Sequence, residues 1–239
     1  MIGTIANTAA IIVGSLVGGI VRHGLKEKYQ SILFVAMGLA ATGLGINAVV
    51  QNMPNSSYPV LFIVSLALGG VIGTALDLDG RFNRLVDRRS KDTENDDAPG
   101  LGRGLSTAIM LFCIGTLSIL GPVNSALYGD ETFLFTNAML DLVTSMVLAS
   151  TFGFGIAIAA GVLFCWQGSI FLLATFLSPL LSSGLMCEVS IVGGFLIFAS
   201  GLSILKIKEI SAMNLLPGLF IPPIWFALLS LASSLGIVL

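Results

Sequence analysis

Long apolar runs, separated by short polar segments, dominate the pattern of this 239-residue chain. Each run holds about 20 residues, the length that a helix needs to cross a bilayer core roughly 30 Å thick. The runs lie at 2–21, 31–50, 58–76, 105–121, 133–153, 156–178, 188–205 and 214–238. They are continuous, whereas the strands of a membrane β-barrel alternate over segments of about ten residues. The pattern therefore predicts an all-α, polytopic membrane helix bundle of about eight spans, forming one transmembrane domain over residues 1–239.

One pair of runs leaves the number of spans at seven or eight. The runs 133–153 and 156–178 meet at Gly153, Phe154 and Gly155, with no charged residue between them. Two full spans in a tight hairpin fit this pattern, and so does a re-entrant pair. The topology on either side of the pair is the same in both cases.

Composition agrees with a membrane location and excludes other classes of protein. Hydrophobic residues make up 55% of the chain and charged residues 10%, with a mean hydropathy of +0.98, whereas soluble domains carry about 25% charged residues. A net charge of −2 without an extended basic face excludes nucleic acid as a partner. Two of the three cysteines, Cys113 and Cys165, lie inside apolar runs, which excludes a disulfide scaffold. The expected surroundings are therefore the lipid bilayer.

The basic residues predict an orientation, because all eleven Lys and Arg residues lie in three loops. These loops follow the first run, the third run and the seventh run: Arg22, Lys26 and Lys28; Arg81, Arg84, Arg88, Arg89, Lys91 and Arg103; Lys206 and Lys208. With eight spans the three loops share one side of the membrane, which the positive-inside rule places in the cytoplasm. Both termini are then expected outside.

The second of these loops, 77–104, is the only plainly soluble stretch of the chain. In one interpretation its basic residues enforce the positive-inside rule and contact lipid head groups. In another, Arg84, Arg88 and Arg89 hold a regulatory anion.

An internal repeat is indicated at an offset of 158 residues, where 42–46 matches 200–204 and 59–63 matches 217–221 without gaps. The second and seventh spans run in opposite directions, so the match indicates an inverted repeat of spans 1–3 and 6–8. Inverted repeats recur in secondary transporters. Residues 109–121 echo the same Gly-Leu-Ser-Ile pattern, so a shared packing motif is the alternative.

Small residues spaced by four line faces of two predicted helices. Gly14 and Gly18 form one such face, and Ser65, Gly69 and Gly73 form another. Such faces allow helices to approach closely in lipid. We expect them to serve helix packing, and a homo-oligomer through them is compatible with the sequence.

Two acidic residues depart from the loop locations of the others: Asp141 lies inside the fifth run and Glu188 opens the seventh. A charge at a helix centre costs about 2.5–3.5 kcal/mol on insertion scales, so Asp141 should face the bundle interior or water. Asn137 and Thr144 share its helical face. Asp141 is either a functional carboxyl or a hydrogen-bonded residue that fixes packing, and Glu188 is either functional or a helix cap.

Further polar and helix-breaking residues complete the candidate pathway for a solute or ion. Amides lie in the first, second and sixth runs, and prolines interrupt the eighth: Asn7, Asn47 and Gln167; Pro217, Pro222 and Pro223. Each amide fits an interhelical hydrogen bond as well as a substrate ligand. The prolines predict a kinked or unwound helix, which is tolerated at membrane depth where it is protein-buried or lines water.

Catalytic signals are absent. The sequence has no Walker loop, no HExxH, no GxSxG and no cluster of metal-ligand residues. We therefore expect neither an enzyme nor a bound cofactor or metal.

Several motifs together resemble a known family. They are, in order, the glycine-rich first helix with Asn7 and Gly14, FCIGTLSILG at 112–121, GD at 129–130, LD at 140–141, AST-x-G at 149–153, QGSI at 167–170, E-x-x-x-x-GG at 188–194 and NLLP at 214–217. In this combination the chain resembles the bacterial membrane family of domain of unknown function 554, the YdfK/YqgA-like proteins. The resemblance implies a multi-spanning protein of the bacterial cytoplasmic (inner) membrane and implies no substrate.

Two positions depart from the pattern of this family. Relatives often carry Glu where this chain has Thr74, and Lys where it has Asn137. A Lys–Asp pair would neutralise a buried charge. Without that Lys, protonation of Asp141 or a bound ion becomes the expected compensation.

Two functions fit these observations. The first is a transporter or channel for a small solute or ion, with Asp141 as a proton- or cation-linked carboxyl. The alternative is a non-transporting membrane regulator or scaffold that acts through the loop 77–104.

Overall fold

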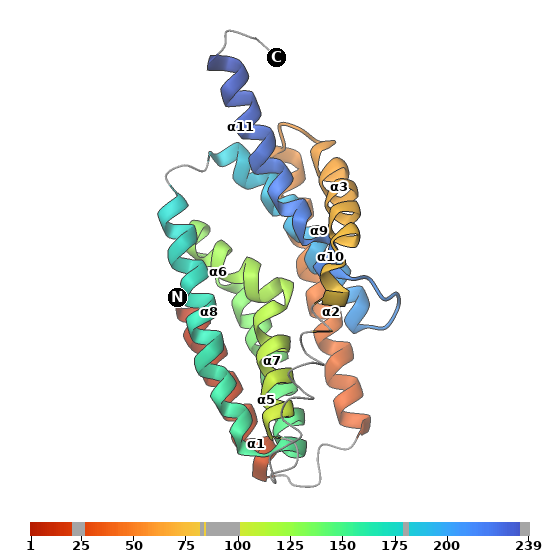
Figure 1. Cartoon of the computed structure of the whole chain (residues 1–239), viewed down its shortest axis with the longest axis vertical. Coiled ribbons are helices and arrows are strands. Elements are labelled where there is room, and N and C mark those ends of the chain that lie inside the picture. Colours follow the sequence, from red (N-terminus) through yellow and green to blue (C-terminus); the bar gives the residue numbers. More distant parts are fainter. Residues whose placement is uncertain (21–26, 82–83, 85–100, 179–181, 235–239) are drawn as a thin grey trace. The chain divides into compact units, whose positions relative to one another are not determined.

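The computed structural model describes residues 1–20, 27–81, 84, 101–178 and 182–234 (Figure 1). Across these described residues the chain is almost entirely helical and contains no strand. The prediction of an all-α, polytopic membrane helix bundle is confirmed. Most of the loop 77–104, with Arg88, Arg89 and Lys91, lies outside the described residues, as do Arg22 and Lys26.

The chain packs as two compact units. The first contains Met1–Ala40 and Gly80–Ser178, and the second contains Ala41–Asp79 and Pro179–Leu239. The helix α2 (Glu27–Asn52) contributes its first half to one unit and its second half to the other. The expectation of a single transmembrane domain stays a prediction, because the division concerns compactness alone.

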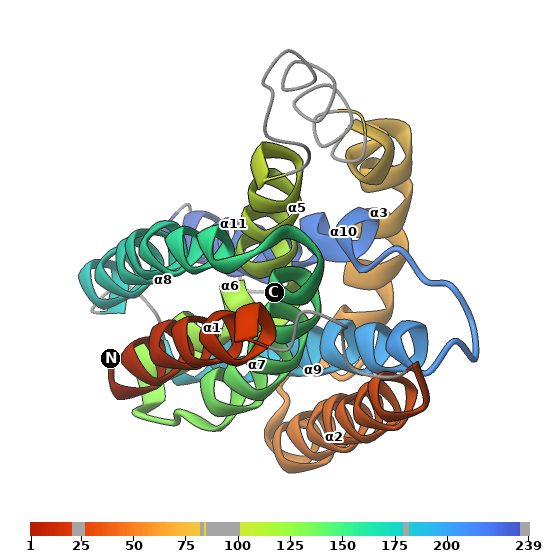
Figure 2. The same ribbon diagram turned by 90° about the horizontal axis from the view of Figure 1, so that it is seen from below.

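In the first unit, α1 packs along α7 and also contacts α8, as Figure 2 shows. The helix α8 packs further on α5 and α6. Its elements are α1 (Ile2–Ile20), α5 (Leu101–Ile114), α6 (Thr116–Tyr128), α7 (Thr132–Phe152), the 3-10 helix η2 (Phe154–Ala157) and α8 (Ile158–Leu177). A buried cluster that includes Ile11, Phe112, Ile156 and Leu163 joins α1, α5, η2 and α8. The first unit therefore has an apolar core besides the polar site described below.

The second unit is built around α9, the most deeply buried of its helices. Its elements besides α2 are η1 (Met53–Asn55), α3 (Leu61–Ala75), α9 (Ser183–Ile204), α10 (Ala212–Leu215), η4 (Leu216–Phe220) and α11 (Ile221–Ser234). The rings of Phe62 and Phe195 stack at 4.9 Å between their centroids, which joins α3 to α9.

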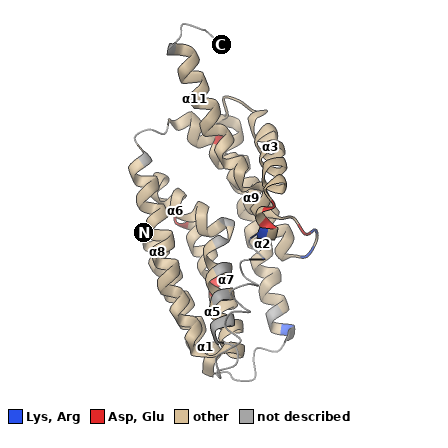
Figure 3. Cartoon of the chain, viewed as in Figure 1, with Lys and Arg blue, Asp and Glu red and all other residues tan. Residues whose placement is uncertain are grey.

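The helices that can span a membrane number six among the described residues, by length and apolar composition. A seventh is counted if α5 and α6, bent by 41° at a short break, form one span. The helix α3 has 15 residues, fewer than the roughly 20 that a helix needs to cross the bilayer core. The helices α7 and α8 have 21 and 20 residues, so each arm of the segment 133–178 is long enough to cross. The predicted number of eight spans stays a prediction. Charged positions are sparse along these helices (Figure 3).

Glycines bring α1 against α7 in the first unit. A side chain at Gly14 would meet the Ser145 hydroxyl and the backbone of Leu142, and one at Gly18 would meet the backbone of Met146. Close contact between the two backbones therefore depends on glycine at both positions.

Antiparallel helix pairs characterise the second unit. Gly45 of α2 lies against the backbone at Phe198, while Gly194 of α9 lies against Val49. Residue numbers thus rise along α2 as they fall along α9, so these helices run in opposite directions. Gly69 of α3 likewise contacts Gly218, and Gly73 contacts Asn214, so α3 runs antiparallel to α10 and η4.

Candidate functional site

Asp141 is the centre of the candidate site in the first unit. It lies at the middle of α7 and its side chain is only 5% exposed. One turn earlier, the Asn137 Nδ2 donates to the Asp141 Oδ2 at 2.9 Å, as the spacing of four residues on a helix allows. Thr144 follows on α7 and is half-buried. No Lys, Arg or His of the described residues pairs with this carboxyl.

Asn7 on α1 contributes a second amide to the same place. It is fully buried and lies within reach of the Asp141 carboxyl. Neither its Oδ1 nor its Nδ2 makes a hydrogen bond of good geometry, so we treat it as a neighbour of Asp141 rather than a bonded partner. The close contact of α1 with α7 at Gly14 holds the two side chains on facing helices.

The break between α5 and α6 lies near this carboxyl. Cys113, one residue from the end of α5, is close enough to Asp141 to feel its charge. At Gly115 the backbone is extended, with φ −60° and ψ 143°, before α6 begins at Thr116. Sequence reasoning treated 105–121 as one continuous run, because the break carries no charged residue. The signals that could have revealed it are Gly115 itself and Pro122 within α6.

Gln167 on α8 joins α8 to α6. Its side chain is fully buried, and its Nε2 donates to the Ser118 Oγ at 3.1 Å. The Gln167 Oε1 has no partner. Sequence reasoning missed Ser118, since a single serine in an apolar run is a weak signal.

Unpartnered polar atoms gather in the first unit. Seven buried side-chain oxygen and nitrogen atoms of described residues lack a hydrogen-bond partner, and five of them lie there: Thr4 Oγ1, Asn7 Oδ1 and Nδ2, Ser15 Oγ and Gln167 Oε1. A buried polar group without a partner costs roughly 1–3 kcal/mol. Of these residues, Asn7 is the one that lies within reach of the Asp141 carboxyl.

Glu188, in the second unit, is the other buried carboxyl among the residues that the structure describes. It is 1% exposed, and its Oε1 accepts from the Ser56 Oγ at 2.7 Å and from the Tyr58 N–H at 3.0 Å. The helix cap of α9 is Ser182, whose hydroxyl accepts from the Leu185 N–H. Ser56 was not anticipated from the sequence, because it lies in a short connector without a motif.

The remaining pathway candidate, Asn47, is exposed on α2 in the second unit. Its Oδ1 accepts from the Gln51 Nε2 at 3.2 Å, one turn along the same helix. The first unit therefore contains Asn7, Asn137 and Asp141, and it also contains Gln167, which is bonded to Ser118 of α6. The second unit contains Asn47 and Glu188.

The prolines of the last apolar run mark a change of helix type. Pro217 lies in η4, and Pro222 and Pro223 lie in the first turn of α11, where a missing N–H is tolerated. Gly218 of η4 packs against the Ser65 backbone of α3. The tight 3-10 turn is thus held by the small-residue face of α3.

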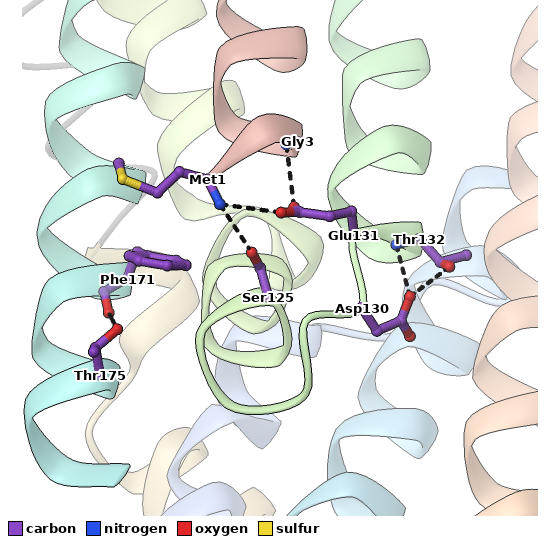
Figure 4. A network of polar contacts seen from close by, with 8 residues as sticks. All are labelled: Met1, Gly3, Ser125, Asp130, Glu131, Thr132, Phe171 and Thr175. Atoms are coloured by element: carbon purple, nitrogen blue, oxygen red, sulfur yellow. Dashed lines mark hydrogen bonds and ion pairs between the residues drawn. The ribbon is translucent and has the colours of Figure 1, made fainter.

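The amino terminus forms a separate polar network (Figure 4). The Met1 ammonium contacts the Glu131 Oε1 at 3.0 Å and the Ser125 Oγ at 3.3 Å, and the Gly3 N–H donates to the Glu131 Oε2 at 3.1 Å. Partial burial alone would raise the pKa of Glu131, but these hydrogen bonds and the ammonium charge lower it below its ordinary value of 4.5. Sequence reasoning missed Glu131, because its partner is a main-chain ammonium rather than a side chain.

Metal ligands do not cluster in the part of the chain that the structure describes: no group of three or more His, Cys, Asp or Glu lies together there.

Comparison with known proteins identifies the family to which this chain belongs. The model of the family described as "Protein of unknown function (DUF554)" matches residues 2–227. The uncharacterized membrane protein YdfK of Bacillus subtilis (strain 168) is 58% identical over 224 residues, which cover 94% of this chain and 95% of that protein. The uncharacterized protein YqgA of Escherichia coli (strain K12) is 28% identical over 225 residues, 92% of this chain and 94% of that protein.

No solved structure matches the chain. The family match extends over nearly the whole sequence, and the relative from Bacillus subtilis is a membrane protein by name. The motifs quoted above therefore lie within a shared domain rather than in a local likeness. The chain is a membrane protein and belongs to the DUF554 family.

Proposed function

We propose that the chain is a transporter or channel of the bacterial cytoplasmic membrane for a small solute or ion. Asp141 serves as its proton- or cation-linked carboxyl. The observation that supports this function is a buried carboxyl without a described basic partner, at the middle of a helix long enough to span, among unpartnered polar atoms. A residue of this kind inside a membrane marks an ion or proton pathway more often than a packing contact.

The neighbouring elements fit this role. The break at Gly115 interrupts a span near Asp141, and discontinuous helices are the typical site of substrate and ion binding in secondary transporters. Asn7, Asn137 and Gln167 supply amides from three different helices. A proton or monovalent cation bound at Asp141 neutralises the carboxyl, so loading and release change the charge of the site.

An inverted repeat and a defined orientation belong to the same proposal. The antiparallel pairing of α2 with α9, and of α3 with α10 and η4, supports a two-fold relation between the segments that the sequence offset aligns. The three basic loops support a cytoplasmic location for those loops and an outside location for both termini.

Flux through reconstituted protein tests the function. Proteoliposomes loaded with pyranine report internal pH while an outside gradient of protons, Na⁺, K⁺ or methylammonium is imposed. We expect at least one of these gradients to drive a protein-dependent pH change, and Asp141→Asn to abolish it. The Asn side chain keeps the size of Asp but neither ionises nor exchanges a proton.

Glu131→Gln is the matched control, because it removes a carboxylate of the same unit outside the candidate site. It should retain flux while Asp141→Asn loses it. Equal flux in wild type and Asp141→Asn, or no flux from the wild type with any of the four probes, would overturn the proposal.

A further inference from the structure

Only one of the two carboxylate oxygens of Glu188 accepts hydrogen bonds. Its Oε1 is saturated by the Ser56 hydroxyl and the Tyr58 N–H, whereas its Oε2 is buried and has no hydrogen-bond partner. An ionised carboxylate with a free buried oxygen needs a positive partner or a donor. A protonated one would place an O–H at this oxygen, and no described acceptor is bonded to it.

The second unit supplies no basic side chain at this place. Its only Lys and Arg residues are Lys206 and Lys208, both exposed beyond the C-terminal end of α9. Lys206 lies 18 residues after Glu188, so the two are about 27 Å apart along the helix. No salt bridge within this unit compensates the carboxylate.

The end of α2 makes the surroundings more negative still. The Cys187 Sγ donates to the Asn52 carbonyl oxygen at 3.1 Å, so the last residue of α2 lies beside the residue next to Glu188. The C-terminal end of a helix carries a partial negative charge and carbonyls without helical donors. The N-terminus of α9, capped at Ser182, is more than one turn away, beyond the effective range of its dipole.

These groups share one ligand chemistry. A carboxylate oxygen, a hydroxyl and carbonyl oxygens are the ligands of hard cations. A single carboxylate matches a single positive charge, and the described residues hold no cluster of three acidic, His or Cys side chains that would suit a divalent or transition metal. We propose that the Glu188 Oε2 and the Ser56 hydroxyl bind one sodium-sized monovalent cation, in the negative surroundings at the end of α2.

This site does not rest on the proposed transport through the first unit. Its ligands come from α9 and the connector 56–58, both in the second unit. A failure of the flux experiment therefore leaves it standing, and its own failure leaves the Asp141 proposal standing.

A tryptophan beside the connector reports on the site. The ring centroids of Tyr58 and Trp225 lie 5.9 Å apart, and Trp166 is the only other tryptophan of the chain. In a Trp166→Phe background, NaCl is titrated at pH 8 into detergent-purified protein, with N-methyl-D-glucamine chloride holding ionic strength constant. We expect a saturable change in Trp225 fluorescence and a rise of the melting temperature by roughly 3 °C near saturation.

Variants separate the site from general salt effects. Glu188→Gln should lose the sodium-dependent change in Trp225 fluorescence, whereas Glu131→Gln, which removes a carboxylate of the first unit, should keep it. Ser56→Ala should weaken sodium binding about fivefold, the effect of losing one ligand hydrogen-bonding group. Ser65→Ala, which removes another buried hydroxyl of this unit, should leave the affinity unchanged.

Three outcomes would overturn the site. They are an equal response to choline chloride, a sodium response retained in Glu188→Gln, and a response to pH alone with none to sodium. If Glu188→Gln does not fold, Ser56→Ala tests the site instead. Unchanged sodium affinity in Ser56→Ala would exclude the proposed ligand set.

Discussion

The two buried carboxyls of the described residues, Asp141 and Glu188, receive their hydrogen bonds in different ways. Asp141 receives its hydrogen bond from Asn137 on its own helix, and other polar groups around it come from α1 and the α5–α6 break. Glu188 receives both of its hydrogen bonds from one short connector, at Ser56 and Tyr58, and all at one oxygen. The first carboxyl lies among several helices with unpartnered neighbours, and the second is fixed by a loop.

This difference predicts different roles. A carboxyl shared among several helices can be exposed or covered when those helices shift, which suits a site that must load and release. A carboxyl held by a connector between two helices fixes that connector and binds a resident ion. The two units are also assembled differently: Gly14 and Gly18 join two long helices in the first, whereas Gly69 and Gly73 hold the broken segment at η4 in the second.

The largest effect is expected at the α1–α7 contact. Gly14→Ala places a methyl group against the Ser145 hydroxyl and the Leu142 backbone, and overpacking of this kind costs about 1–3 kcal/mol. We expect the melting temperature to fall by roughly 3–10 °C. Gly43→Ala is the matched control, because no atom lies within 4 Å of a Cβ there. It should be neutral or stabilising, since Ala is the better helix former. An unchanged melting temperature for Gly14→Ala would mean that α1 does not depend on this contact.

A smaller effect is expected at the Asp141 site itself. Asn137→Ala removes the hydrogen bond to the buried carboxyl, and such a bond contributes about 0.5–1.5 kcal/mol net. The melting temperature should therefore fall by roughly 1–6 °C. Thr144→Ala, on the same helix but half-buried, should change it little. Equal shifts in the two variants would show that Asp141 is satisfied by other groups.

The helices themselves were predictable from the sequence. Hydropathy over about 20 residues is set by the thickness of the bilayer, so the apolar runs became α1, α7 and α8 with boundaries displaced by at most two residues. The helix α9 begins at Ser183, five residues before the predicted start at 188. The pair Asn137 and Asp141 also followed, because residues four apart share a helical face.

The neighbours of each site were not predictable in the same way. In lipid every outward face of a helix is apolar, so periodicity does not tell which helix packs on which. The contact of Gln167 with Ser118, and of Glu188 with Ser56, depends on that tertiary choice. The break at Gly115 was hidden for a different reason: an extended residue between two apolar helices leaves hydropathy unchanged.

The smallest effect is expected at the amino-terminal network, and it depends on pH. Because the pKa of Glu131 is lowered in the folded protein, its contribution is fully present above about pH 5 and is lost as pH falls through 4.5 toward the lower folded value. Glu131→Gln should therefore lower the melting temperature at pH 7 by at most roughly 3 °C, the range of an exposed ion pair.

At pH 3.5, below the ordinary pKa of 4.5, the difference between Glu131→Gln and wild type should shrink, because the unfolded wild-type chain then takes up a proton that the folded carboxylate resists. Glu209→Gln, an exposed carboxylate of the second unit, is the control and should match wild type at both pH values. A Glu131→Gln deficit that is as large at pH 3.5 as at pH 7 would mean that its side-chain packing, not the ion pair with the Met1 ammonium, holds the start of α1 against α7.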